Sequence, residues 1–353
     1  MCANKNEKLI LFFDECGRED TPLVGGKCAN LGEMCKIGAP VPPGFAVTTR
    51  MYETFLEDTG AGDRLRAYVG KIDFTPTTIA EFNKIGDELA NIVLDCELPR
   101  SLATQISDAY EEFSEKLGLR SPSVAVRSSG VAEDSASASF AGQYDSYLNV
   151  IGVAAVLDGV RRCWASAFTP RCVSYRLHNG FGLLPGSISV AVQKMVKSRS
   201  AGVGFTANPN TGERNKIVIE GNWGTGESVV QGISNVDIFS INKETFAVVE
   251  KSINRKTKQV ILLDSGTSEQ DIPEDQQLTA CLDEHEVRCL AEHARRLEDH
   301  YSLPLDIEWA VDRELSFPDN IFIVQARPIT AIAEQRSSTD ILLDLALTRL
   351  FPV

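Results

Sequence analysis

The sequence predicts an α+β fold arranged in two lobes. A chain of 353 residues is long enough for two domains, or for one large two-lobed domain with a sizeable core. Short apolar runs with strand character alternate with longer segments of helical spacing. Near the C-terminus, two apolar runs flank a polar loop, which is typical of a β-hairpin. We divide the chain into residues 1–200, residues 201–330 and a tail at 331–353.

The first lobe begins with a short predicted strand, Leu9–Phe13, and continues as a mainly helical segment over residues 21–115. Thr48 or Thr49 is a candidate N-cap, because a hydroxyl can accept a hydrogen bond from a first-turn amide. Helical spacing of apolar residues is clearest over Ala103–Leu117. From about residue 118 to residue 200, strand signals alternate with helices.

The second half of the chain adds strands and one amphipathic helix. The first lobe includes a helix at Ala154–Phe168, and the second lobe carries three apolar runs with strand character, Ile217–Glu220, Val236–Ile241 and Val260–Leu263. In the charged stretch Asp283–His300, three residues at helical spacing are predicted to face inward: Val287, Leu290 and Leu297. We interpret the histidines of this stretch, and His178, as surface or packing residues.

The C-terminal hairpin gathers side chains that suit a metal bound to a polyphosphate. In its first run, Asp306 and Glu308 share a face. In its second run, strict alternation predicts one shared face for four side chains: Ile321, Ile323, Gln325 and Arg327. Carboxylate and amide oxygens beside a guanidinium suit Mg²⁺ bound to phosphate oxygens. An ordinary salt-bridged hairpin is the alternative.

Two further segments have features of phosphate-binding loops. Val24-Gly25-Gly26-Lys27 is not a P-loop, because Cys28 follows the lysine where that motif requires Ser or Thr. A short strand, Val124–Ser129, ends on Arg127 and two hydroxyls, and small polar residues follow it as far as Ser146. Such a loop can offer amides and hydroxyls to phosphate oxygens. A structural turn and an ordinary surface loop are the alternatives.

Taken together, these segments resemble the nucleotide-binding part of the phosphoenolpyruvate-utilising family. Its members include phosphoenolpyruvate synthase, pyruvate phosphate dikinase, rifampin phosphotransferase and phenylphosphate synthase. The resemblance runs from about Leu23 to Thr330 and rests on VGGK, VRSS, SFAGQ, the VQKMV run at Val192–Val196, and DIEWA followed by VQARP. It implies an ATP-grasp fold, with ATP bound between two α+β subdomains.

The resemblance also implies a role for each matching residue. The catalytic cations on the ATP phosphates would be Lys27, Arg127 and Arg327. The loop that closes over the phosphates would include Gly142 and Ser146. The adenine hinge would be formed by Gln193, Lys194, Met195 and Val196. The Mg²⁺ ligands would be Glu308 and Gln325. The glycine-rich turn Trp223–Glu227 also matches the family, without an assigned role.

Composition is consistent with this resemblance and excludes other classes of function. The net charge of −14 argues against nucleic acid or an anionic membrane as a partner. The nine cysteines include no C-x-x-C pair, so we expect free thiols in a reducing compartment. Apolar runs are too short for a membrane span, which needs about 18 residues. The expected location is cytoplasmic.

The function that follows is an ATP-binding subunit of a dikinase-type phosphotransferase. By resemblance, the family splits ATP into AMP and phosphate and passes the β-phosphoryl group through a histidine to an acceptor. None of the four histidines here has the glycine- and threonine-rich context of that carrier. The expected partner is therefore a separate phosphohistidine-carrying subunit. An apolar stripe in the tail, Leu343 to Leu350, is a candidate dock for it or packs on its own lobe.

The acceptor is expected to be a small molecule. The separate nucleotide subunit most resembles phenylphosphate synthase, whose acceptor is phenol. One alternative is a split or truncated nucleotide domain of phosphoenolpyruvate synthase, with pyruvate as acceptor, or of an antibiotic phosphotransferase. Another alternative, of a different class, is a regulatory protein that binds ATP without turnover.

Overall fold

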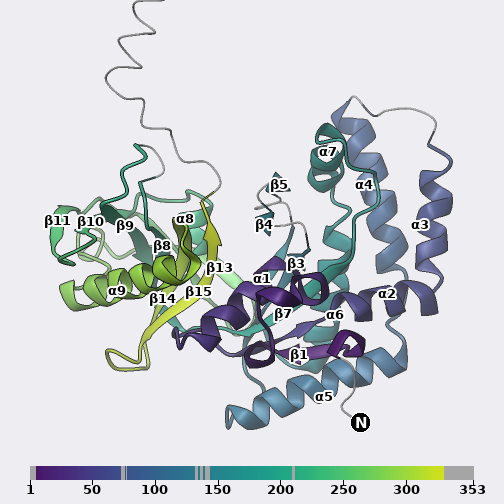
Figure 1. The fold of residues 1–353 in the computed structure, drawn as a ribbon, viewed down its shortest axis with the longest axis horizontal. Helices are drawn as coiled ribbons and strands as arrows, with labels where there is room; N and C mark the ends of the chain where they lie inside the picture. Colours follow the sequence, from purple (N-terminus) through teal and green to yellow (C-terminus); the bar gives the residue numbers. More distant parts are fainter. Residues whose placement is uncertain are drawn as a thin grey trace, which may run out of the picture.

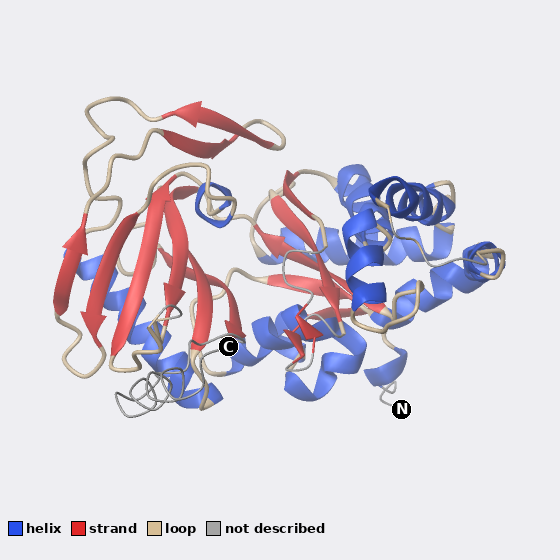
Figure 2. Ribbon diagram, turned by 90° about the horizontal axis from the view of Figure 1, so that it is seen from above, coloured by secondary structure: helices blue, strands red, loops and turns tan. Residues whose placement is uncertain are grey.

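Two β-sheets with their covering helices make up the body of the protein (Figures 1 and 2). The computed structural model describes residues 5–72, 76, 78–131, 134–135, 138–139, 144–208 and 211–329. Gly142 and the predicted tail at 331–353 lie outside these ranges. The predicted mixture of helices and sheets is confirmed.

The first sheet has five antiparallel strands from the first part of the chain. In spatial order they are β1 (Ile10–Phe12), β2 (Gly44–Val47), β7 (Ile188–Lys194), β3 (Val124–Gly130) and β6 (Ser146–Val150). The helices of this part are α1 (Thr21–Lys36), α2 (Thr49–Asp58), α3 (Ala61–Val69), α4 (Ile79–Leu94), α5 (Arg100–Lys116), α6 (Val153–Ser166) and α7 (Pro170–His178). Three short 3₁₀ turns lie near the N-terminus, at Lys5–Glu7, Phe13–Glu15 and Arg18–Asp20.

Strand β3 lies inside the first sheet, and its side chains alternate between two environments. Val124 and Val126 pack into the core formed with α6 and its neighbouring helices. Ser128 faces the same side, where its hydroxyl donates to the Cys163 carbonyl at 3.2 Å. Because side chains alternate along a strand, Arg127 points to the opposite side. That side faces the second sheet.

The second sheet has six antiparallel strands from the later part of the chain. Their spatial order is β11 (Val248–Ser252), β10 (Asp237–Asn242), β9 (Lys216–Trp223), β8 (Ser198–Phe205), β14 (Leu305–Asp312) and β15 (Ile321–Pro328). A short helix, α8 (Glu227–Val230), follows β9. Two further pairs of strands stand apart: β12 (Lys258–Leu262) with β13 (Thr267–Asp271), and β4 (Asp134–Ser135) with β5 (Ala138–Ser139).

Helix α9 (Glu284–Tyr301) covers one face of the second sheet, as its sequence pattern predicts. Val287, Leu290 and Leu297 are all buried there. A capping box starts the helix: the Asp283 carboxylate accepts from the Glu286 amide at 2.9 Å, and the Glu286 carboxylate accepts from the Asp283 amide at 3.0 Å. Both bonds satisfy amides that the helix itself leaves unpaired.

Helix α1 joins the two sheets into one core. It contacts β3 and β7 of the first sheet and β15 of the second (Figure 1). One continuous apolar cluster includes Leu31 and Met34 of α1 together with Ile307 and Ile323 of the second sheet. The helix is interrupted at Gly25, whose φ of 70° lies in the left-handed region. A Cβ there would lie 2.0 Å from the Ser129 carbonyl oxygen, so only glycine fits.

The structure corrects two sequence expectations. The segment expected to be helical, residues 21–115, contains strand β2, a four-residue run buried on both faces that has no alternation to reveal it. In β15 the four side chains predicted to share a face are divided between two faces. Glu308 pairs with Gln325 but Trp309 pairs with Ile323, so Val324 is an extra residue that forms a β-bulge.

Two general expectations can be compared with the described part of the chain. No disulfide joins any two of its eight cysteines, and six of them are buried. Among the described helices, none combines the length and the apolar character that a membrane span requires.

Candidate functional site

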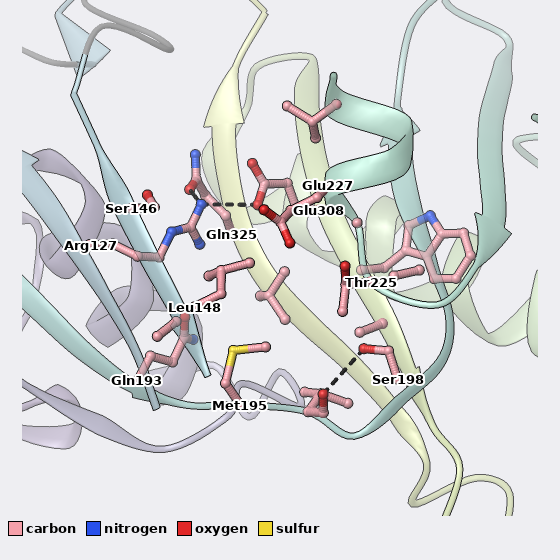
Figure 3. Close-up of a pocket in the computed structure, with 18 of the residues that line it drawn as sticks. Arg127, Ser146, Leu148, Gln193, Met195, Ser198, Thr225, Glu227, Glu308 and Gln325 are labelled. Carbon is pink, nitrogen blue, oxygen red and sulfur yellow. Dashed lines mark hydrogen bonds and ion pairs between the residues drawn. The ribbon is translucent and has the colours of Figure 1, made fainter. Parts of the chain in front are cut away.

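A cavity of about 730 Å³ lies between the two sheets and is lined by segments from both (Figure 3). Every described residue of the predicted site lines it: Lys27, Arg127, Ser146, Gln193, Lys194, Met195, Val196, Glu308, Gln325 and Arg327. These residues come from α1, three strands of the first sheet or its edge, and the β14–β15 hairpin. Gly142 is the one predicted residue that falls outside the described ranges.

Arg127 connects the two sheets across this cavity. Its Nη2 donates to Glu308 Oε2 at 3.1 Å and to Gln325 Oε1 at 2.8 Å. Figure 3 shows the guanidinium reaching from β3 toward both acceptors. Its Nε is buried and has no hydrogen-bond partner within the described residues. A buried donor without a partner is costly, so this nitrogen is available to a bound ligand.

The bulge at Val324 determines which side chains of the hairpin face the cavity. In the part of β15 that precedes the bulge, Ile321 and Ile323 pack under α9. Beyond it, the alternation is shifted by one residue, so Gln325 and Arg327 face the cavity. If the strand ran through Val324 with unbroken alternation, it would bury an amide and a guanidinium against the apolar core, which is strongly unfavourable.

Arg327 is held by its cross-strand neighbour Asp306. Its Nε and Nη2 donate to Asp306 Oδ2 at 2.9 and 2.7 Å. Burial raises the pKa of the Asp306 carboxyl, the Arg327 guanidinium opposes that shift, and the negative charge of Glu308 adds to it. The pair fixes the orientation of Arg327 beside the two oxygens that contact Arg127.

Lys27 approaches the cavity from the helical segment that follows the interruption at Gly25. Its Nζ donates to the Ser128 carbonyl at 2.6 Å, and only 6% of the residue is exposed. The Cys28 amide donates to Ser129 Oγ at 3.1 Å, which attaches the same helix to the end of β3. The two sequence motifs, VGGK and VRSS, are therefore in direct contact.

One end of the cavity is apolar. Val196, Ala201 and Ala310 form a small cluster with the partly buried Phe322 and Val324. Met195 and Leu148 also line this end (Figure 3). Such a surface suits the flat, apolar faces of a ring system.

Part of the predicted hinge is already engaged by the protein. The Lys194 and Met195 amides donate to the carbonyls of Pro43 and Ser123, each at 2.9 Å. The Gln193 side chain is buried, and its amide group donates to the Pro42 carbonyl at 3.4 Å. These three donors therefore hold the first sheet together and are not directed at a ligand.

The charge of the cavity is opposite to that of the whole chain. Five cationic residues line it: Lys27, Arg127, Arg171, Lys194 and Arg327. Three acidic residues line it as well: Asp145, Glu227 and Glu308. This excess of positive charge lies in a protein of net charge −14, so the cavity is a local site for an anionic ligand.

The sequence analysis assigned no role to several cavity residues. Thr225 and Glu227 come from the glycine-rich turn before α8, the one signal that could have identified them. Within the described residues, Thr225 Oγ1 and Glu227 Oε2 are buried without a hydrogen-bond partner. Arg171, at the start of α7, forms an ion pair with Asp145 beside the cavity. No motif surrounds Arg171 in the sequence.

The oxygens at the hairpin fit a divalent cation that is bound together with a ligand. Glu308 Oε2 and Gln325 Oε1 converge on a single nitrogen of Arg127, so both can contact one cation. No cluster of three or more His, Cys, Asp or Glu suited to a metal occurs among the described residues. Two oxygen ligands completed by phosphate oxygens and water are the usual environment of Mg²⁺.

Comparison with known proteins gives one matching family over most of the chain. Residues 21–342 match "Pyruvate phosphate dikinase, AMP/ATP-binding domain". A probable phosphoenolpyruvate synthase of Methanothermobacter thermautotrophicus is 38% identical over 339 residues, covering 96% of this chain and 48% of that protein. The phosphoenolpyruvate synthases of Aeropyrum pernix and Synechocystis are each 38% identical and are covered over 44% and 43% of their length.

This chain thus spans less than half the length of each of these relatives. Among solved structures, a protein of Pyrococcus horikoshii Ot3 aligns with 70% of this chain and 98% of its own, at 12% identity and a TM-score of 0.30. That likeness is too weak to bear on the fold.

Proposed function

This chain belongs to the family of the pyruvate phosphate dikinase AMP/ATP-binding domain, and we propose that it binds Mg·ATP in the cavity between its two sheets, in the manner of an ATP-grasp protein. The observation that carries the proposal is the convergence of Arg127, Glu308 and Gln325, contributed by both sheets, in one cationic cavity. A volume of about 730 Å³ is within the range of small-molecule sites.

The triphosphate is assigned to the cationic end of the cavity. Lys27, Arg127 and Arg327 there come from three separate segments and can surround a polyphosphate. Arg127 carries a buried Nε without a partner among the described residues, and Arg327 is oriented by Asp306. When phosphate oxygens separate, fixed cations stabilise the developing charge without having to reorganise.

Glu308 and Gln325 are the residues we assign to Mg²⁺. When bound, the metal neutralises charge on the phosphate oxygens. Arg127 must then release both oxygens, and the phosphates offer its guanidinium new acceptors. The Asp306 carboxylate holds Arg327 in place while this exchange occurs.

The adenine ring is assigned to the apolar end, against Met195, Val196 and Leu148. The Lys194 and Met195 amides already donate hydrogen bonds to the carbonyls of Pro43 and Ser123. The edge of the base would therefore form its hydrogen bonds with the backbone beyond Met195. Buried apolar walls with a few polar backbone groups are typical of cofactor sites.

The phosphoryl group would leave the cavity on a histidine brought from outside. Within the described residues, which include all four histidines of the chain, no histidine lines the cavity. By family resemblance, ATP is split into AMP and phosphate while the β-phosphoryl group moves to such a histidine. The carrier would be on another polypeptide, or on a segment that the relatives have in the rest of their length.

We take pyruvate as the acceptor. The relatives reported above are named phosphoenolpyruvate synthase, which favours this alternative over the phenol expected from the separate subunit. Nothing in those names supports a role in phenol metabolism.

The test combines binding and turnover. The purified chain is expected to bind Mg·ATP in a calorimeter and to form no phosphorylated product from pyruvate or phenol. AMP should appear when the phosphohistidine part of a related phosphoenolpyruvate synthase is added. Glu308→Gln should abolish that AMP formation with the fold intact, and Glu314→Gln, an exposed acid paired with Lys197, should not. Absence of ATP binding by the wild-type chain would refute the proposal.

A further inference from the structure

The β12–β13 hairpin belongs to the second part of the chain, but its turn docks on the first sheet. In Figure 2 this small hairpin stands apart from the six-stranded sheet and reaches toward the five-stranded one. The contact is made at Asn149 of β6, which is 3% exposed. The turn itself, residues 263–266, is closed by a hydrogen bond from the Leu263 amide to the Gly266 carbonyl at 3.1 Å.

Asn149 makes three hydrogen bonds to this turn and one to Ser123. Its Nδ2 donates to the carbonyls of Leu263 and Gly266 at 2.7 and 2.8 Å. Its own carbonyl accepts from the Gly266 amide at 3.1 Å. Its Oδ1 accepts from Ser123 Oγ at 2.6 Å.

The backbone of Asn149 is also unusual. Its φ of 55° is in the left-handed region, which asparagine tolerates better than most residues. In this conformation the side-chain amide and the backbone carbonyl both form hydrogen bonds with the same turn. Asparagine is therefore suited to the site for two independent reasons, its backbone preference and its two amide hydrogens.

The residues that Asn149 joins are in turn hydrogen-bonded to segments that line both sides of the cavity. On the first sheet, the Ser123 carbonyl accepts from the Met195 amide at 2.9 Å, and Met195 lines the apolar end. On the second, the Val260 carbonyl of β12 accepts from the Thr225 amide at 2.8 Å, and the Lys258 carbonyl accepts from Asn222 Nδ2 at 2.9 Å. Thr225 and Glu227, in the glycine-rich turn before α8, line the cavity.

We propose that Asn149 is a positioning residue for the nucleotide: it fastens the β12–β13 hairpin as a strap between the two lobes and so sets the distance between Met195 and the Thr225–Glu227 turn. The inference rests on the proposed nucleotide site. It goes beyond that proposal because Asn149 does not itself line the cavity and acts only through the residues that do.

The test uses a substitution that changes one group. Asn149→Asp keeps the size of the side chain, its tolerance of the left-handed backbone and its acceptor for Ser123. It replaces the two amide hydrogens by an oxygen that faces the Leu263 and Gly266 carbonyls. Ser123→Ala removes only the bond to Ser123 Oγ. Asn235→Asp is the matched control, because the amide of Asn235 donates to the Arg255 carbonyl within the second lobe.

Two readouts are needed. Amide hydrogen exchange of residues 258–271 without nucleotide reports the strap directly, and calorimetry with Mg·ATP and with Mg·tripolyphosphate reports the cavity. Asn149→Asp should speed exchange in the hairpin and weaken ATP binding about tenfold, as expected when buried polar groups lose their partners. Tripolyphosphate affinity should not change, since its cationic ligands do not depend on the strap. Ser123→Ala should show a smaller effect of the same kind, and Asn235→Asp none.

Failure of this inference can be distinguished from failure of the proposed function. If the wild-type chain fails to bind ATP, the nucleotide proposal falls and with it the positioning role. If it binds ATP and Asn149→Asp binds equally well, the inference is overturned, whether or not hairpin exchange has changed. A variant that loses ATP and tripolyphosphate affinity in equal measure would show a general structural effect and would overturn it as well.

Discussion

At the scale of single residues, Arg127 has the most consequential position. It is the side chain of the first sheet that contacts the cavity oxygens of the second, through Glu308 and Gln325. Arg127 is 181 positions from Glu308 and 198 from Gln325, so no local pattern connects it with either. The sequence motifs identified each one separately, and the structure brings them within hydrogen-bond distance.

Replacing Arg127 by alanine should lower kcat/KM for ATP-dependent AMP formation by about 10²- to 10³-fold, the usual loss when one preorganised donor to a reacting group is removed. The measurement is steady-state AMP formation in the presence of the phosphohistidine partner. Arg162→Ala is the control, because Arg162 forms an exposed ion pair with Asp158 on α6. Normal turnover of Arg127→Ala would remove this arginine from the reaction.

At the scale of secondary-structure elements, the bulge in β15 decides which side chains reach the cavity. The extra residue, Val324, lets Ile323 pack under α9 while Gln325 faces the opposite side. A run of apolar residues such as Ile321–Val324 shows no sign of a bulge, because valine fits either face. The β14–β15 hairpin could be predicted from sequence, whereas the change of face within β15 could not.

Deleting Ala326 should abolish Mg·ATP binding, because Arg327 would then take the place of that buried residue, opposite Ile307, and turn toward the apolar core. The same change should lower the melting temperature, since a buried guanidinium without its partner is strongly destabilising. Calorimetry and thermal unfolding measure the two effects. Deleting Val324 is the control: Gln325 then follows Ile323 directly, stays opposite Glu308 and still faces the cavity, so most of the affinity should be retained. Intact ATP binding in the variant that lacks Ala326 would contradict this account of the hairpin.

Helix α9 gives a prediction about pH. Burial, aided by the charge of Arg296, lowers the pKa of His293 below its ordinary value of 6.5. The folded state therefore binds this proton less readily than the unfolded state, so the stability contributed above pH 6.5 is lost as pH falls. The loss cannot exceed about 1.4 kcal/mol per pH unit for one proton.

Urea unfolding of the wild-type protein and His293→Gln at pH 7.5 and 5.5 checks this. The wild type should lose more stability on acidification than the variant does. Equal losses in the two proteins would mean that His293 titrates alike in the folded and unfolded states.

Helices and long strands were predictable because their periodicity repeats over many residues, as in α9 and α5. Strand β2 was missed because four buried residues carry no period. The roles of Thr225, Glu227 and Arg171 were missed for a different reason. Each reaches the cavity through the packing of distant segments, which a sequence pattern does not record.

At the scale of the whole molecule, the two sheets are not independent units. The core around α1 includes Leu31 and Met34 of that helix, Ala191 of the first sheet and Ile323 of the second. Asn149 and the β12–β13 hairpin add a second connection. The lobes are therefore expected to unfold together.

Calorimetric unfolding of the wild-type chain should give one transition whose calorimetric and van't Hoff enthalpies agree. Leu31→Ala should destabilise that single transition by about 2–5 kcal/mol, the usual cost of truncating a buried leucine. Two resolved transitions, or a Leu31→Ala effect on only one of them, would show that the lobes are thermodynamically separate.

The double hydrogen bond of Arg127 has a further consequence, for the order in which ligands arrive. With no nucleotide present, the guanidinium neutralises Glu308 and supplies the donor that Gln325 needs. A free divalent ion gains little at a carboxylate whose charge Arg127 already neutralises. A nucleotide changes this, because its phosphates draw Arg127 away while they deliver the ion. Without nucleotide, the protein should thus bind magnesium only weakly, and ATP should bind to it together with magnesium, as a single Mg·ATP complex.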